Sequence, residues 1–97
     1  MEARDYIIIL YDIYGELLNE KQKEYFESYY FQNLSLGEIA LNRNVSRNTI
    51  HKVIRGVEEK LKFYEEKLAL FKKNKIIYDI IEKENNEEIK KKLQSLL

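Results

Sequence analysis

This chain of 97 residues contains no strong helix breaker, because it has no proline and only three glycines. Proline interrupts a helix most strongly, at a cost of about 3 kcal/mol in a helix interior. Apolar residues recur at helical spacing along most of the chain, and we find neither an internal repeat nor a low-complexity linker. The sequence therefore predicts an all-α protein built as a helical bundle.

A long helix beginning after Ser46 is the most regular predicted element. Its apolar residues alternate four and three positions apart, which is heptad spacing: Ile50, Ile54, Val57, Leu61, Tyr64, Leu68 and Phe71. Gly56 is its weak point. We expect the first half of this row to pack on the preceding helices. The second half is predicted to be a packing or dimer seam, covered by the tail or by a second copy, and it comprises Leu61, Tyr64, Leu68 and Phe71.

Two helices are expected before residue 31. The first covers residues 4–18; its three consecutive isoleucines could also form a strand, but no second strand-like segment exists to pair with it. Asn19 and Gln22 form a capping box for the second. That helix carries an aromatic group, which could stack on bases but fits a buried helix face better: Tyr25, Phe26, Tyr29 and Tyr30.

The segment 35–54 has the pattern of a helix-turn-helix. Ser35 and Glu38 form a capping box for a short helix that ends near Asn42, and Ser46 caps the long helix. Arg43 and Asn44 make the turn, where Asn tolerates a positive φ. Ala40 is the small residue expected where two such helices cross. The apolar residues expected to lock the pair are Ile39, Val45, Ile50 and Val53.

The charge distribution singles out the same segment. Net charge is zero, but residues 1–30 carry seven acids and three bases, whereas residues 39–57 carry four bases, one histidine and no acid. Arg and Asn suit base edges, and Lys suits phosphates. The alternative is that these residues merely solvate an outer helix face. The candidate nucleic-acid-binding residues are Arg43, Ser46, Arg47, Asn48, His51, Lys52 and Arg55.

Several classes of function find no support in the sequence. There is no cysteine and only one histidine, which argues against thiolate and histidine metal sites. We find no calcium-loop spacing, phosphate loop or nucleophile motif. We therefore expect no enzyme activity, no catalytic residue, no cofactor and no metal. Neither a membrane span nor a signal peptide is recognisable, so a cytoplasmic protein is expected.

A polar segment at residues 72–75 separates the helix-turn-helix domain, predicted as residues 1–71, from a helical tail over residues 72–97. Isoleucines from position 76 to 81 form one helical face of this tail. Asn86 is expected to cap a last helix over residues 87–97, whose apolar stripe comprises Ile89, Leu93, Leu96 and Leu97.

The chain resembles the YlxM family of small bacterial proteins, whose helix-turn-helix is similar to region 4 of sigma factors. The resemblance spans roughly residues 6–70. It rests on LYDIYGELL at 10–18, EKQ at 20–22, YY at 29–30, LSLGEIA at 34–40, VSR at 45–47 and YEEKL at 64–68. The chain departs from the family at residues 41–43 and 48–56, and the latter include the positions that would contact bases.

The resemblance implies a role in the protein-targeting pathway of the signal recognition particle, because the family's genes tend to lie beside those of its GTPases. Three hypotheses follow. The chain is a dimeric DNA-binding regulator, an accessory factor that binds the particle's RNA or GTPase, or a protein-interaction module in which the helix-turn-helix is a scaffold.

Overall fold

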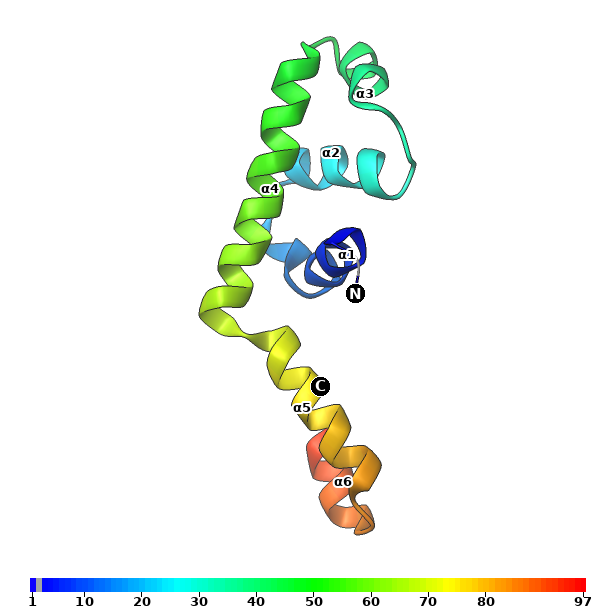
Figure 1. Ribbon diagram of the computed structural model, residues 1–97, viewed down its shortest axis with the longest axis vertical. Coiled ribbons are helices and arrows are strands. Elements are labelled where there is room, and N and C mark those ends of the chain that lie inside the picture. Colours follow the sequence, from blue (N-terminus) through cyan, green and yellow to red (C-terminus); the bar gives the residue numbers. More distant parts are fainter. Residues whose placement is uncertain (2) are drawn as a thin grey trace.

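The computed structural model describes Met1 and residues 3–97. These residues form helices and no strand, which confirms the all-α prediction (Figure 1). The elements are α1 (Ala3–Tyr14), a 3₁₀ turn η1 (Gly15–Leu17), α2 (Glu20–Tyr30), α3 (Leu36–Arg43), α4 (Arg47–Leu68), α5 (Leu70–Lys83) and α6 (Glu87–Gln94). The molecule is elongated, with principal extents of 56 × 23 × 22 Å.

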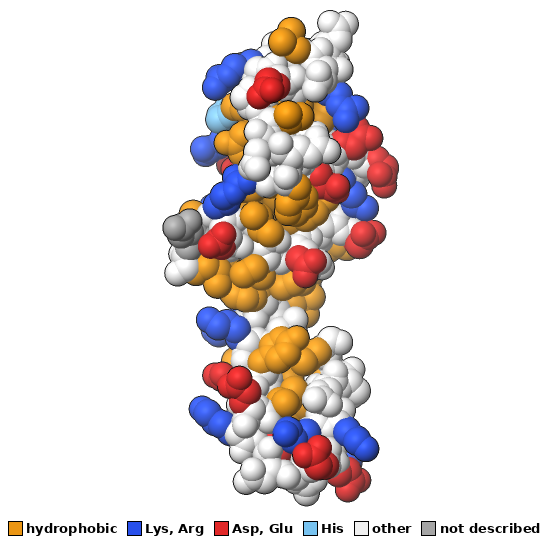
Figure 2. All heavy atoms as spheres, turned by 90° about the vertical axis from the view of Figure 1, so that its right-hand side faces the viewer, with side chains coloured by type: hydrophobic (Ala, Val, Ile, Leu, Met, Phe, Trp, Pro, Cys, Tyr) orange, Lys and Arg blue, Asp and Glu red, His pale blue; other side chains and the backbone are white. Residues whose placement is uncertain are grey.

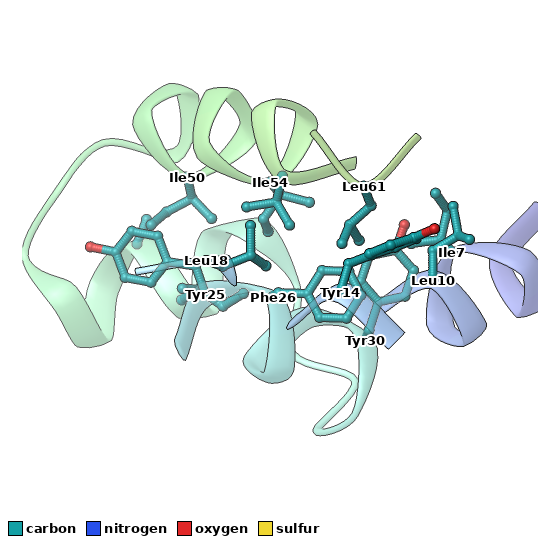
Figure 3. Packing of buried hydrophobic residues seen from close by; sticks show 13 residues of the cluster. Ile7, Leu10, Tyr14, Leu18, Tyr25, Phe26, Tyr30, Ile50, Ile54 and Leu61 are labelled. Carbon is teal, nitrogen blue, oxygen red and sulfur yellow. The ribbon is translucent and has the colours of Figure 1, made fainter. Parts of the chain in front are cut away.

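The hydrophobic core forms where α1, α2 and α3 pack along one side of α4 (Figure 3). Four residues of the heptad row are buried there, namely Ile50, Ile54, Val57 and Leu61. The aromatic residues of α2 belong to this core, as expected. Phe26 is fully buried and stacks between Tyr11 and Tyr30, at ring-centroid distances of 4.1 and 4.4 Å. These rings are therefore not available as a base-stacking platform.

The first segment is a helix and not a strand, but it is shorter than the sequence predicts. α1 ends at Tyr14, and η1 turns the chain before α2. A helix continued to residue 18 would place Leu17 on the packing face, whereas Leu17 is exposed and Ile7 is buried instead. The tighter 3₁₀ turn changes the direction of the side chains that follow it.

The predicted helix caps are present. Asn19 accepts from the backbone N–H of Gln22 at 2.8 Å, and Ser35 accepts from that of Glu38 at 3.1 Å. In both cases the side chain of the third helical residue accepts a hydrogen bond from the backbone N–H of the cap residue, which completes the capping box. Side-chain oxygens thus satisfy amides that lack a partner within the helix.

The long helix ends earlier than the heptad row predicts. α4 stops at Leu68, and Ala69 has a φ of 54°, in the left-handed region. Phe71 therefore belongs to α5, where its ring packs edge-on against Tyr6 of α1 at 5.8 Å. Leu61 is fully buried and Tyr64 packs against Tyr14, whereas Leu68 is 45% exposed. The chain's own helices thus cover most of the expected seam, and its last member lies on a different helix.

Two side chains hold the junction between α4 and α5. The Tyr14 hydroxyl donates to Glu65 Oε1 at 2.6 Å and accepts from the backbone N–H of Leu70 at 3.0 Å. The Glu65 carboxylate also accepts from the amides of Phe71 and Lys72, at 3.0 and 3.2 Å. A side chain of α4 therefore caps the first turn of α5, whose own N-cap residue provides no side-chain bond.

The tail forms a hairpin of α5 and α6 that points away from the helix-turn-helix end and does not fold back along α4 (Figure 1). Asn86 caps α6 as expected, and the helix ends at Gln94. Neither helix of the hairpin has a buried residue.

Candidate nucleic-acid interface

α3 and α4 form the helix-turn-helix, and the turn between them has the backbone that the sequence predicts. Asn44 has φ 55° and ψ 45°, and its N–H bonds to the carbonyls of Ala40 and Leu41. Asparagine populates this left-handed region more readily than most residues. The turn directs α4 away from α3, so that the first turn of α4 lies at one end of the molecule (Figure 1).

The locking residues are buried with one exception. Ile39, Ala40 and Ile50 are buried, and Val53 is partly buried. Val45 is 37% exposed, so its prediction as a core residue is wrong. It lies in the turn, where its backbone N–H donates to the Ala40 carbonyl at 3.1 Å.

Five of the seven candidate residues lie together on the first three turns of α4. All five are exposed, and we call them the basic strip: Arg47, Asn48, His51, Lys52 and Arg55. The first turn of α4 contains no acidic residue. In Figure 2 the single histidine lies among Lys and Arg side chains at the upper edge of the molecule.

The charges of the strip differ in how they are neutralised. Within the described residues, Arg47 and Lys52 have no carboxylate within the 4.0 Å limit of an ion pair. Arg55 reaches Glu59 one turn later, at 4.0 Å. An exposed pair at this distance is weak, so Arg55 keeps most of its capacity to meet another anion.

Ser46 and Arg43 lie outside the strip. The Ser46 hydroxyl caps α4 by accepting from the N–H of Thr49 at 3.1 Å, so its contribution is to orient the helix N-terminus. Arg43 ends α3 and pairs with Glu24 of α2 at 3.0 Å, above the ring of Tyr25. Arg43 therefore ties α3 to α2, and the structure does not bring it together with the basic strip.

A small pocket of about 160 Å³ borders the strip and includes residues that sequence reasoning missed. Tyr29 of α2 and Glu58 of α4 line it together with His51 and Arg55. Glu58 also accepts a hydrogen bond from the Tyr30 hydroxyl. The acid-free surface around the strip therefore ends at the Glu58 carboxylate. The sequence contains a signal for this residue, because Glu58 comes directly after the acid-free segment.

Met1 and residues 3–97 lack two further features. No helix there is both long and apolar enough to cross a bilayer. No group of three or more metal-ligating side chains lies close enough together to hold an ion.

An arrangement of two capped helices, with an exposed basic strip on the second, is the geometry of a helix-turn-helix unit. The whole chain, residues 1–97, matches the UPF0122 family model, described as "putative helix-turn-helix protein, YlxM / p13 like". The chain belongs to this family. The family resemblance found in the sequence is thereby confirmed.

Individual UPF0122 relatives align over most of the chain. One from Ureaplasma urealyticum is 42% identical over 93 residues, covering 96% of this chain and 94% of its own. One from Caldanaerobacter subterraneus is 45% identical over 78 residues, covering 80% and 67%. One from Clostridium kluyveri is 46% identical over 77 residues, covering 79% and 69%.

Proposed function

We propose that this chain is a non-enzymatic, cytoplasmic regulatory protein that binds DNA through its helix-turn-helix. The observation that carries the proposal is the exposed basic strip on the first turns of α4, where Arg47 and Lys52 lie without a neutralising carboxylate among the described residues. In helix-turn-helix proteins the start of the second helix is the part that reaches base edges. Membership of UPF0122 supports the same conclusion.

Each residue of the strip has a role that its chemistry suits. Arg47 and Asn48 come first on α4, where a guanidinium can bind guanine and a carboxamide can bind adenine, each through two hydrogen bonds. Lys52 and Arg55 lie further along and would meet phosphates on either side of the groove. The capped N-terminus of α4, held by Ser46, adds backbone N–H groups that favour a phosphate.

The test is to measure binding of a fluorescent DNA duplex by the full chain over a series of salt concentrations. Arg47→Ala combined with Lys52→Ala removes one base contact and one phosphate contact, and the phosphate contact contributes about 0.9 to the magnitude of the slope of log K against log salt. We therefore expect the magnitude of the slope to fall by about 1 and the affinity at low salt to fall by about tenfold or more. Lys60→Ala is the matched control, because Lys60 is also exposed on α4 but lies beyond the strip.

Two results would contradict the proposal. One is binding that the double variant leaves unchanged, and the other is wild-type binding that does not depend on salt. Either result would favour the third hypothesis, in which the protein is a protein-interaction module and the helix-turn-helix is a scaffold.

The finer version of the proposal concerns the target. The family resemblance supports a role beside the signal recognition particle, with its RNA or its GTPase as partner in place of chromosomal DNA. Sequencing the nucleic acid that co-purifies with the protein from its native cells separates chromosomal DNA from the particle's RNA, because one abundant small RNA and many chromosomal fragments give different read distributions. A pull-down from the same cells tests the GTPase. A homodimer, also part of this proposal, would present two α4 helices to half-sites about 34 Å apart.

A further inference from the structure

A hollow lies between α1 and α2, away from the basic strip. It has a volume of about 700 Å³ and is open to solvent on one side. We call it the acidic groove, because its wall combines apolar side chains with three carboxylates and a single lysine, Lys23. The apolar and acidic residues are Ile8, Ile9, Phe31, Asp12, Glu16 and Glu27. Figure 2 shows hydrophobic side chains across the middle of the molecule with acidic side chains around them.

The carboxylates of the groove are only partly neutralised. Glu16 pairs with Lys23 at 3.4 Å, and Glu27 accepts from the Tyr11 hydroxyl at 2.5 Å. Asp12 has no basic partner within the ion-pair limit among the described residues. Residues 1–30 carry seven acids against three bases, so the groove lies in the most acidic part of the chain. It therefore favours a cationic occupant with apolar side chains.

The α5–α6 hairpin has the opposite character. Residues 70–97 carry seven lysines and five acids, and the exposed apolar side chains of the hairpin include Ile76, Ile80, Ile89 and Leu96. Lys73 lies one turn before Ile76 on α5, and Lys92 lies one turn after Ile89 on α6. A two-helix hairpin without a buried residue has too little core to hold its helices firmly, so covering this face would stabilise it.

The hairpin cannot fill the acidic groove of its own chain. α5 begins against Tyr6, which its Phe71 contacts at 5.8 Å. Ile8 lies about 160° around the α1 axis from Tyr6, and Asp12 lies about 120° around it, so both face away from the side that α5 contacts. Reaching the groove would require breaking the junction that Tyr14 and Glu65 hold.

We infer that the acidic groove of one copy receives the α5–α6 hairpin of a second copy, and that the exchange is reciprocal. The apolar stripe of the hairpin lies against Ile8, Ile9 and Phe31, while its lysines meet the carboxylates at the rim. A two-fold dimer of this kind forms the same contact twice and leaves neither surface open. The inference deepens the homodimer named in the proposed function by giving its interface, and it does not depend on nucleic-acid binding.

The test uses light scattering coupled to size-exclusion chromatography on the full chain without nucleic acid. The wild type is expected at twice its 11.8 kDa mass. The groove variant carries Asp12→Lys with Glu16→Lys, and the hairpin variant carries Lys73→Glu with Lys92→Glu. Each variant alone sets like charges against each other at both contacts, so the dimer dissociation constant should rise by about 100-fold or more.

Mixing the two variants tests whether these surfaces meet directly. In the mixed pair a lysine-bearing groove faces a glutamate-bearing hairpin, and the native combination is kept at the other contact, so a dimer should form again. The control variant, Lys60→Glu with Lys62→Glu, reverses two exposed charges of α4 that lie outside both surfaces and should stay dimeric. Circular dichroism checks that every variant keeps its helices.

Three outcomes would overturn the inference. A wild type that remains at 11.8 kDa up to about 1 mM would exclude the dimer. A dimer that survives both charge reversals would form through another surface. A mixture that stays monomeric after each reversal has dissociated its own dimer would show that groove and hairpin do not pair. Since no nucleic acid is present, none of these results bears on the function of the basic strip.

Discussion

Gly56 lies in the middle of α4 on its solvent side. A methyl group added there would meet no atom within 4 Å, so the residue is not kept small by packing. Glycine in a helix interior is about 1 kcal/mol less favourable than alanine. Gly56 therefore lowers the stability of α4, as the sequence indicates, and no packing contact in the described fold requires a glycine there.

We predict that Gly56→Ala raises the free energy of unfolding by about 1 kcal/mol, measured by urea denaturation followed by circular dichroism. Gly15→Ala is the control, because its added methyl would come within 3.3 Å of the Tyr11 ring, and the neighbour would have to yield. The gain should be smaller there, or reversed. Equal gains at the two sites would mean that packing against Tyr11 does not matter.

Ala69 has a left-handed backbone conformation that its residue type does not predict. Its φ of 54° resembles those of Asn33 and Asn44, at 55° each. Asparagine tolerates this region, whereas an alanine there costs about 1 to 2 kcal/mol. Alanine is also the best helix former, and the heptad row has members on both sides of residue 69, at Leu68 and Phe71. The sequence therefore predicts a continuous helix there. Only contacts made by the folded chain can break a helix at such a residue.

At the scale of elements, those contacts come from Glu65 and Tyr14. The Glu65 carboxylate accepts from the Tyr14 hydroxyl and from two backbone amides of α5, and it fixes where α5 starts. One carboxylate thus replaces the side-chain cap that Ala69 cannot provide.

We expect Glu65→Ala to lower the free energy of unfolding by about 1 to 3 kcal/mol, because it leaves donors at the junction without their partner. Hydrogen exchange should also accelerate at the amides of Phe71 and Lys72. Glu66→Ala, which changes the exposed neighbour, should leave both measurements near wild type. Unchanged exchange at these two amides in the Glu65 variant would contradict this view of the junction.

The elements that the sequence predicts well are those with local signals. Asn19, Ser35 and Ser46 cap their helices because each needs only the next three residues to do so. Exposure of the basic strip also follows from periodicity, since Ile50 and Ile54 fix the buried side of α4. The pairing of Arg43 with Glu24 and the exposure of Val45 depend on how separate helices meet, which spacing alone does not specify.

At the scale of the whole molecule, three tyrosine–carboxylate hydrogen bonds connect three helices pairwise. Tyr11 with Glu27 joins α1 to α2, Tyr14 with Glu65 joins α1 to α4, and Tyr30 with Glu58 joins α2 to α4. Burial, followed by the hydrogen bond to Glu65, raises the pKa of Tyr14 to about 12. The pKa values of Tyr11 and Tyr30 are raised as well, first by burial and then by their carboxylate partners.

The protein should therefore lose stability in alkaline solution. These tyrosines lose their protons at a higher pH in the folded state than in the unfolded state, where the pKa is the ordinary 10.0. Their contribution to the free energy of unfolding is therefore complete below pH 10 and declines as the pH rises toward 12. Urea midpoints measured at pH 8, 10 and 11 should fall across this window. Tyr14→Phe should flatten the decline, and a midpoint that stays constant to pH 11 would contradict the role of these bonds.

The length of α4 has a consequence for assembly. Its 22 residues span about 33 Å, with the basic strip at one end and the α5 junction at the other. A polyanion at the first turn and a second copy at the tail would therefore bind at opposite ends of α4. Any communication between the two ligands would have to pass along one rod, as a bend or a tilt of α4 against α1 and α2.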